Sequence, residues 1–115
     1  MMRLVAGLVD QESSWNPIAV SPTGHTGLGQ LSPSIARYFG VKNRKDPYQN
    51  LMGTTAYLAH NFAQYNGNVD LVLADYHCGM RAVKAAKGRI PNCHDKAAGI
   101  TTPQYVAMVR KKAGV

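Results

Sequence analysis

The sequence lacks several features that would assign it to a common class of protein. Its uninterrupted apolar runs are only a few residues long, whereas a membrane-spanning helix needs about 20, so no transmembrane helix is expected. It has no repetitive or strongly polar tract, and 45% of its residues are hydrophobic against 17% charged, which excludes a disordered chain. Because 115 residues are too few for two independent cores, residues 1–115 are predicted to form one domain.

Acidic side chains are also scarce, and this makes the chain basic. Six Asp and Glu accompany 13 Lys and Arg, which gives a formal net charge of +7. This balance favours a polyanionic partner, such as nucleic acid, an anionic membrane or a wall polymer rich in carboxylates. The basic residues form two modest clusters, 42–45 and 110–112, and neither is interleaved with stacking aromatics. Nucleic acid is therefore not the expected partner.

Only two cysteines are present, Cys78 and Cys93, and each is adjacent to a histidine, in His77-Cys78 and Cys93-His94. Their spacing does not fit the known zinc patterns, and adjacent residues of a helix point in different directions. Two free thiols are the preferred interpretation, a disulfide is the second and a metal site is a distant third. A disulfide would indicate an oxidising compartment.

Capping residues, prolines and glycines divide the chain into predicted helices. No run of alternating β-branched residues competes with them, so the domain is predicted to be all-α, with at most a small ribbon in the glycine-rich segment 21–30. Residues 88–101 are predicted to be a loop. The helices are expected from the N-terminus to just before Asn16-Pro17, from Ser32-Pro33 to Gly40, from Asp46-Pro47 to about Gly67, from Asp70 to Gly79, from there to Gly88, and from Thr102-Pro103 onward.

Helical spacing also predicts which faces are buried. In the helix that begins at Asp46-Pro47, one stripe is predicted to be the core face, and it consists of Leu51, Thr55, Leu58, Phe62 and Tyr65. In the last helix, the apolar stripe consists of Val106, Val109 and Ala113.

Glu12 is the only glutamate of the chain and lies at an unusual position. It continues the apolar stripe of Leu4, Val5, Leu8 and Val9 into the last turn of the first predicted helix. Unpaired acids seldom face a core, and desolvation there raises the pKa of a carboxyl group, so that it can donate a proton near neutral pH. The competing interpretation is a solvated acid at a frayed helix end.

Several linked motifs resemble those of the soluble lytic transglycosylase domain. They are Glu12-Ser13-Ser14-Trp15-Asn16-Pro17, Ser21-Pro22-Thr23-Gly24 and Gly27-Leu28-Gly29-Gln30-Leu31, followed by Asp46-Pro47 with Asn50-Leu51 and Gly53, the segment Leu73 to Gly79, and Tyr105-Val106. The resemblance covers nearly the whole chain. It implies a lysozyme-like fold of about five to six helices, with a glycine-rich loop or small ribbon lining the cleft.

The resemblance also implies a reaction. Glu12 would protonate the glycosidic oxygen between N-acetylmuramic acid and N-acetylglucosamine, and would then take the proton from the muramic 6-hydroxyl. A 1,6-anhydro end would form without water, cofactor or metal. The residues implied to bind substrate are Ser21, Gly27, Gln30, Tyr76 and His77. Taken one at a time, they would be interpreted as turn, surface or core residues.

A second carboxylate would favour hydrolysis instead. Asp10 faces elsewhere on its helix, Asp46 and Asp70 are expected as N-caps, and Asp95 is expected in a polar loop, so Asp75 is the candidate that would position water. The alternatives to a transglycosylase are a hydrolytic muramidase and a non-catalytic wall-binding module. Departures from the family pattern at Gly29, Asp75, His77 and Thr101-Thr102 leave these alternatives open.

The place of action is a separate question. Residues 1–9 put one basic residue before an apolar stretch, but Asp10, Gln11 and Glu12 follow without a cleavage site, so no signal peptide is expected. The expected substrate is the glycan strand of the periplasmic wall. Delivery is therefore expected through a virion or a secretion or conjugation apparatus.

Overall fold

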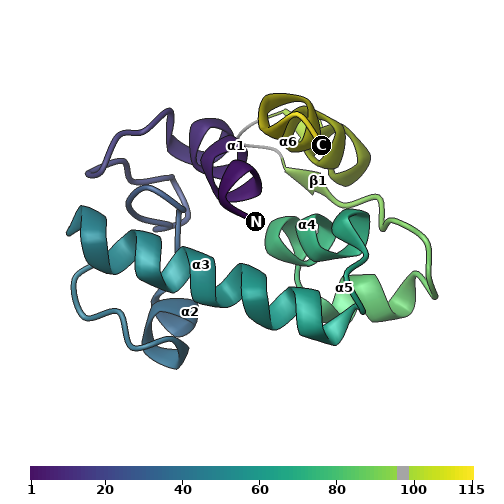
Figure 1. Cartoon of the computed structure of the whole chain (residues 1–115), viewed down its shortest axis with the longest axis horizontal. Coiled ribbons are helices and arrows are strands. Elements are labelled where there is room, and N and C mark those ends of the chain that lie inside the picture. The colour runs from purple at the N-terminus through teal and green to yellow at the C-terminus, as the bar shows by residue number, and fades with distance from the viewer. Residues whose placement is uncertain (96–98) are drawn as a thin grey trace.

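The chain folds around one long helix that runs along the molecule (Figure 1). The computed structural model describes residues 1–95 and 99–115. Within these residues the elements are α1 (Met2–Ser13), α2 (Pro33–Tyr38), α3 (Pro47–Gln64), α4 (Val69–Cys78), α5 (Met80–Ala85), β1 (His94–Asp95), β2 (Ile100–Thr101) and α6 (Thr102–Ala113). The all-α prediction is confirmed, with six helices among the described residues.

The ends of α2 and α3 follow the predicted capping signals. The Ser32 side chain accepts a hydrogen bond from the Ile35 amide, and the Asp46 side chain accepts one from the Gln49 amide. In both helices a proline occupies the first turn, where its missing N–H costs nothing. The boundaries of both helices were therefore predictable from local chemistry.

The predicted cap of α4 is wrong by two residues, whereas α6 begins at Thr102 as predicted. Asn68, not Asp70, caps α4 by accepting from the Leu71 amide, while Asp70 lies in the first turn and pairs with Arg110 at 2.7 Å. At α6 the cap is Thr101, whose hydroxyl accepts from the Gln104 amide. Asn and Asp are equally good caps, so residue type alone did not distinguish Asn68 from Asp70.

Residues 88–101 are not entirely loop as predicted. β1 and β2 pair antiparallel, with His94 opposite Thr101 and Asp95 opposite Ile100; residues 96–98 lie outside the described part of the chain. In the glycine-rich segment, single bridges join Val20 to Thr26 and Thr26 to Leu31. That segment is therefore the small ribbon that the sequence allowed.

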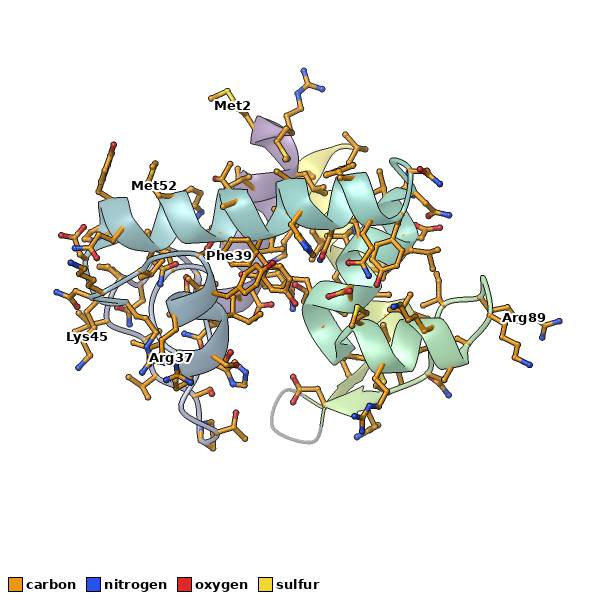
Figure 2. All side chains as sticks on the ribbon, turned by 90° about the horizontal axis from the view of Figure 1, so that it is seen from below. Met2, Arg37, Phe39, Lys45, Met52 and Arg89 are labelled. Carbon is orange, nitrogen blue, oxygen red and sulfur yellow. A yellow bond between two sulfur atoms is a disulfide. The ribbon has the colours of Figure 1, made fainter. Side chains whose placement is uncertain are left out.

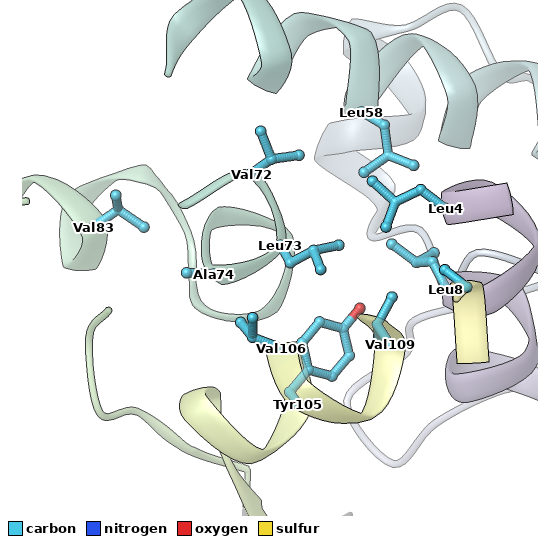
Figure 3. Close-up of a cluster of buried hydrophobic side chains, with 11 residues drawn as sticks. Leu4, Leu8, Leu58, Val72, Leu73, Ala74, Val83, Tyr105, Val106 and Val109 are labelled. Atoms are coloured by element: carbon cyan, nitrogen blue, oxygen red, sulfur yellow. The ribbon is translucent and has the colours of Figure 1, made fainter. Parts of the chain in front are cut away.

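The apolar core lies between α1, α4 and α6 and the middle of α3 (Figure 3). Gly7 lets α1 and α6 approach closely, since a Cβ there would lie 2.8 Å from the Ala113 backbone nitrogen and 2.9 Å from the Val109 oxygen. The fully or nearly fully buried apolar residues of this cluster are Leu4, Leu8, Leu58, Val72, Leu73, Ala74, Val83, Tyr105, Val106, Val109 and Ala113. The predicted stripe of α6 is confirmed.

The buried face of α3 differs from the prediction. Thr55 is exposed, and Leu51, Phe62 and Tyr65 are only partly buried. The buried stripe consists of Asn50, Gly53, Thr54, Leu58 and Asn61. Apolar residues were expected to mark the core face, but this helix is buried partly against backbone that requires hydrogen-bonding partners.

The chain has a formal net charge of +7. Arg37 and Lys45 project at one end of the molecule and Arg89 at the other (Figure 2). Within the described residues, none of the helices has the length and apolar character of a membrane span.

Candidate active site

Glu12 lies in the last turn of α1, where the helix ends abruptly. Ser14 adopts a left-handed conformation, with φ of 50°, and its amide donates to the Asp10 carbonyl. Trp15 also has a positive φ, of 64°. Two consecutive residues in this region of conformational space turn the chain away, so that Glu12 stays at the exit of a helix whose preceding turn is in the core.

A tyrosine from the other end of the chain holds the Glu12 carboxyl group. The Tyr105 hydroxyl donates to Glu12 Oε2 at 2.7 Å, and the Tyr105 ring is buried in the core beside Val106 and Val109 (Figure 3). Because the ring is fixed by packing, the hydroxyl fixes the carboxyl group in turn. The sequence did not assign Tyr105 to the site, although it belongs to the Tyr105-Val106 motif.

The surroundings of Glu12 favour its protonated form. Burial raises the pKa of the Glu12 carboxyl to about 7, above its ordinary value of 4.5, and the negative charge of Asp95 also raises it. The hydrogen bond from Tyr105 acts in the opposite direction and lowers the pKa. Because burial is the largest of these effects, Glu12 can hold a proton near neutral pH and release it there.

Glu12 lines a pocket of about 310 Å³. A second pocket of similar volume shares His25, Gln30, Tyr76, His77 and Cys78 with the first, so the two form one continuous cleft. The first pocket is lined by Glu12, Ser21, Thr23, His25, Gln30, Tyr76, His77, Cys78, Cys93, His94 and Asp95. Four of the five predicted binding residues, Ser21, Gln30, Tyr76 and His77, therefore lie in the pocket of Glu12.

One side of the cleft, which we call the loop wall, consists of residues 20–31. The Ser21 hydroxyl accepts from the His25 amide at 3.1 Å, and the Gln30 amide group donates to the Ala19 and Gly27 carbonyls at 3.0 Å each. Gly27 does not line the pocket. It has φ of +84°, and a Cβ there would lie 2.1 Å from the Arg44 oxygen. Its contribution is therefore to the path of the loop.

Buried polar side chains attach the loop wall to the rest of the molecule. Asn50 in α3 is fully buried; its Oδ1 accepts from the Gly29 amide at 2.8 Å, and its Nδ2 donates to the Thr26 and Arg44 carbonyls. Arg44 Nη1 donates to the Gly24 and Leu31 carbonyls at 2.7 and 3.0 Å. From the sequence, Asn50 was identified only as a motif position, and its attachment of the loop wall was not predicted.

Tyr76 contacts the loop wall. Its hydroxyl donates to the Gly29 carbonyl, and its ring stacks on Tyr57 with centroids 4.8 Å apart. A Cβ at Gly29 would lie 2.0 Å from Thr54 Oγ1 and 2.8 Å from the Tyr76 hydroxyl. Gly29 departs from the family pattern, and the two hydroxyls that occupy this space explain why a glycine is present here.

The opposite side, which we call the ribbon wall, consists of the C-terminal end of α4 and residues 93–95. A disulfide joins Cys78 to Cys93, with their Cα atoms 6.2 Å apart, so the preferred interpretation of two free thiols is wrong. Spacing in sequence could not show that the end of α4 lies alongside the segment leading to β1. The described residues contain no group of three His, Cys, Asp or Glu side chains arranged to hold a metal ion.

Asp75 lies away from Glu12, in the second pocket. Its side chain is buried, and its two oxygens accept hydrogen bonds from the hydroxyls of Tyr57 and Tyr65. The carboxylate nearest to Glu12 in the first pocket is instead Asp95. The sequence placed Asp95 in a polar loop, and only the pairing of β1 with β2 brings it into the cleft.

Comparison with known proteins agrees with this fold. Residues 1–98 match the family model of the transglycosylase SLT domain. The chain is similar to a transglycosylase of Enterobacteria phage PRD1, with 48% identity over 77 residues, which are 67% of this chain and 29% of that protein. It is also similar to the membrane-bound lytic murein transglycosylase F of Photobacterium profundum, with 41% identity over 83 residues, 67% of this chain and 16% of that one.

Solved structures with a similar fold are also lytic transglycosylases. The fold is similar to that of the 70 kDa soluble lytic transglycosylase of Escherichia coli, with a TM-score of 0.79 and 24% identity, covering 98% of this chain and 21% of that chain. It is equally similar to an inactive mutant of the lytic transglycosylase Slt of Pseudomonas aeruginosa, with a TM-score of 0.79, 26% identity and the same coverage. The fold is thus the lysozyme-like one of lytic transglycosylases.

The chain itself belongs to the transglycosylase SLT domain family. This confirms the resemblance that the motifs indicated. The chain spans less than a third of the length of the relatives to which it was compared.

Proposed function

We propose that this chain is the catalytic domain of a peptidoglycan lytic transglycosylase that cleaves the bond between N-acetylmuramic acid and N-acetylglucosamine. The observation that carries the proposal is the Glu12 carboxyl group, which is partly buried in the last turn of α1 and accepts a hydrogen bond from Tyr105 at 2.7 Å. Burial raises its pKa to about 7. Membership of a family whose relatives are named lytic transglycosylases supports the same reaction.

Glu12 acts twice in this proposal. Protonated Glu12 donates its proton to the glycosidic oxygen as the bond from that oxygen to the muramic anomeric carbon breaks. The resulting carboxylate then accepts the proton of the muramic 6-hydroxyl, whose oxygen bonds to the same carbon and gives the 1,6-anhydro end. Because the hydroxyl belongs to the substrate, its attack is intramolecular and needs no second carboxylate. A pKa near the working pH suits a group that must both give and take a proton.

The remaining cleft residues are proposed to bind the glycan. Ser21 and Gln30 present polar side chains from the loop wall, and Tyr76 and His77 present rings from α4. Gly27 shapes the loop that carries the first two. The basic surface, with a net charge of +7, would attract a wall polymer that carries carboxylates.

The proposed place of action is the periplasmic cell wall. The Cys78–Cys93 disulfide supports exposure to an oxidising compartment. Delivery by a virion is supported by the similarity to a phage transglycosylase, and a secretion apparatus is the other proposed carrier.

The test compares wild type with Glu12→Gln on purified sacculi. Glu12→Gln keeps the shape of the side chain but has no proton to donate, and the expected loss of turbidity clearance is at least about 100-fold. Mass spectrometry should find new 1,6-anhydro ends with wild type alone. Asp10→Asn is the matched control, because Asp10 lies on the same helix but pairs with Lys112 at 3.0 Å. Equal clearance by wild type and Glu12→Gln would reject catalysis and favour a binding module.

A further inference from the structure

The chain continues beyond α4 into a segment that carries basic side chains and no acid. Residues 76–94 contain no Asp or Glu. They contain four Lys and Arg residues, all with exposed side chains: Arg81, Lys84, Lys87 and Arg89. We call residues 81–89 the cationic segment. It begins in α5, where Arg81 and Lys84 are three residues apart and lie on the same side of the helix.

The charges of the cationic segment are not neutralised within the described part of the chain. Its four basic side chains form no ion pair in residues 1–95 and 99–115. By contrast, Arg110 and Lys112 of α6 pair with Asp70 and Asp10 at 2.7 and 3.0 Å. Unpaired cations that are gathered in one place attract anions.

The cationic segment begins at the rim of the cleft. Gly79 lines the second pocket and joins α4 to α5. An α-helix rises about 1.5 Å per residue, so Lys84 lies about 7.5 Å along the axis from Gly79. Val83 is buried, whereas Arg81 and Lys84 are exposed. Arg89, the last residue of the segment, projects at one end of the molecule (Figure 2). The segment therefore leads from the cleft along the surface.

The cleft differs from the cationic segment in the charges that it presents. Among the described residues that line the two pockets, none is Lys or Arg. The sugar rings of a wall glycan are uncharged, whereas its peptide stems, which are attached to the lactyl group of muramic acid, carry free carboxylates. A cleft without Lys or Arg beside an exposed cationic segment matches this division of charge.

We propose that the cationic segment binds carboxylates of the peptide stem on a muramic acid residue held in the second pocket. The inference rests on the proposed function, because it requires a glycan strand in the cleft. The second pocket measures about 310 Å³, which is at the small end of the range for ligand pockets. A stem attached to a sugar bound there therefore extends outside the pocket.

The stem is long enough to reach the cationic segment. An extended peptide spans about 3.5 Å per residue, so a stem of about four residues reaches about 14 Å. This length exceeds the distance along the axis from Gly79 to Lys84. The Arg81 guanidinium can bind a carboxylate through two parallel hydrogen bonds, and Lys84 adds a compact positive charge beside it.

The experiment measures binding to sacculi in the Glu12→Gln background, so that the strands are not cleaved during the measurement. One sample of sacculi is untreated, and in the other a carbodiimide with excess ammonium converts the stem carboxylates to neutral amides. Co-sedimentation at about 0.15 M salt, where the Debye length is about 8 Å, gives a Kd for each sample. Glu12→Gln is expected to prefer untreated sacculi. Adding Arg81→Gln and Lys84→Gln should lower this preference about fivefold, as expected for two exposed ion pairs.

The preference is a ratio of two Kd values and does not depend on the fraction of folded protein. Lys42→Gln with Lys45→Gln is the matched control, because both side chains are exposed and form no ion pair among the described residues. Lys45 lies at the opposite end of the molecule from Arg89 (Figure 2). The control should keep the preference of Glu12→Gln to within about twofold, because charges beyond a Debye length are screened.

A fall in preference with Arg81→Gln and Lys84→Gln alone would support the proposal. Equal falls in the two double variants would mean attraction by the net charge only and would overturn it, as would no fall in either. No preference for untreated sacculi in Glu12→Gln itself would also overturn stem binding, while anhydro ends formed by wild type would leave the proposed function standing. The expected fall in a protein whose wild type forms no anhydro ends would support stem binding and overturn the proposed reaction.

Discussion

The loop wall buries Leu28 and Leu31 and is attached to α3 through Asn50 and to Arg44 by hydrogen bonds. The ribbon wall continues from the end of α4 and is attached by a disulfide and by Thr102. Glu12 lies in the pocket between them and is attached to neither, since its partner Tyr105 belongs to the core. The hydrogen-bond partner that holds the Glu12 carboxyl group therefore comes from the core and not from either wall.

The largest effect is expected from breaking the attachment of the loop wall. Asn50→Ala leaves the Gly29 amide and the Arg44 carbonyl without their side-chain partner and removes one of two donors to the Thr26 carbonyl, which also accepts from the Leu31 amide. The free energy of unfolding should fall by about 3–5 kcal/mol. Urea unfolding measures this. Asn61→Ala is the control, because Asn61 is as buried as Asn50 but, within residues 1–95 and 99–115, donates to a single backbone carbonyl, that of Val72. The loss in this variant should be about 1–2 kcal/mol. Equal losses would contradict the importance of the loop attachment.

Removing the disulfide of the ribbon wall should lower the free energy of unfolding slightly less than Asn50→Ala does. The disulfide closes a loop between residues separated by 15 positions, so Cys78→Ser with Cys93→Ser should lower the free energy of unfolding by about 3 kcal/mol. Thermal unfolding of wild type with a reductant should match the double variant, and the reductant should leave the double variant itself unchanged. An equal thermal midpoint for oxidised and reduced wild type would show that the crosslink does not stabilise the fold.

A smaller effect is expected at the contact between the loop wall and α3. Gly29→Ala places a Cβ 2.0 Å from Thr54 Oγ1, and overpacking of this kind costs about 1–3 kcal/mol. Thr54→Ala removes that oxygen, so the double variant should recover part of the loss in a double-mutant cycle. Strictly additive losses would mean that the two residues do not share the space.

The smallest expected effect is a shift in the pKa of Glu12 when the Tyr105 hydroxyl is removed. Tyr105→Phe removes a hydrogen bond that lowers the Glu12 pKa, so the pKa should rise. Because Glu12 must be protonated to act as an acid, activity falls as pH rises through that pKa, and the falling limb should move to higher pH in the variant. A pH profile of kcat measures the shift. Movement of the limb to lower pH would contradict the hydrogen bond as described.

The sequence predicted much of the fold because local signals determine it. Ser32-Pro33 and Asp46-Pro47 mark helix starts whatever lies around them, and the glycines of segment 21–30 exclude a helix. The buried face of α3 was not predictable, because Asn50 and Asn61 satisfy backbone groups that only the folded chain brings near.

The grouping of the candidate site residues was predicted where it depends on motifs and was missed where it depends on tertiary contacts. Glu12, Ser21, Gln30, Tyr76 and His77 lie together as the motif order implied. Tyr105 is separated from Glu12 by 93 positions, and Asp95 enters the cleft only through the β1–β2 pairing. Neither position can be inferred from spacing along the chain.

The central claim is that burial keeps the Glu12 carboxyl group protonated near neutral pH. Glu12 is the only glutamate in the chain, so labelling glutamate with ¹³C at the carboxyl carbon gives one signal to follow by NMR against pH. The account predicts a titration midpoint of about 7. A midpoint near 4.5, the ordinary value for this group, would contradict it.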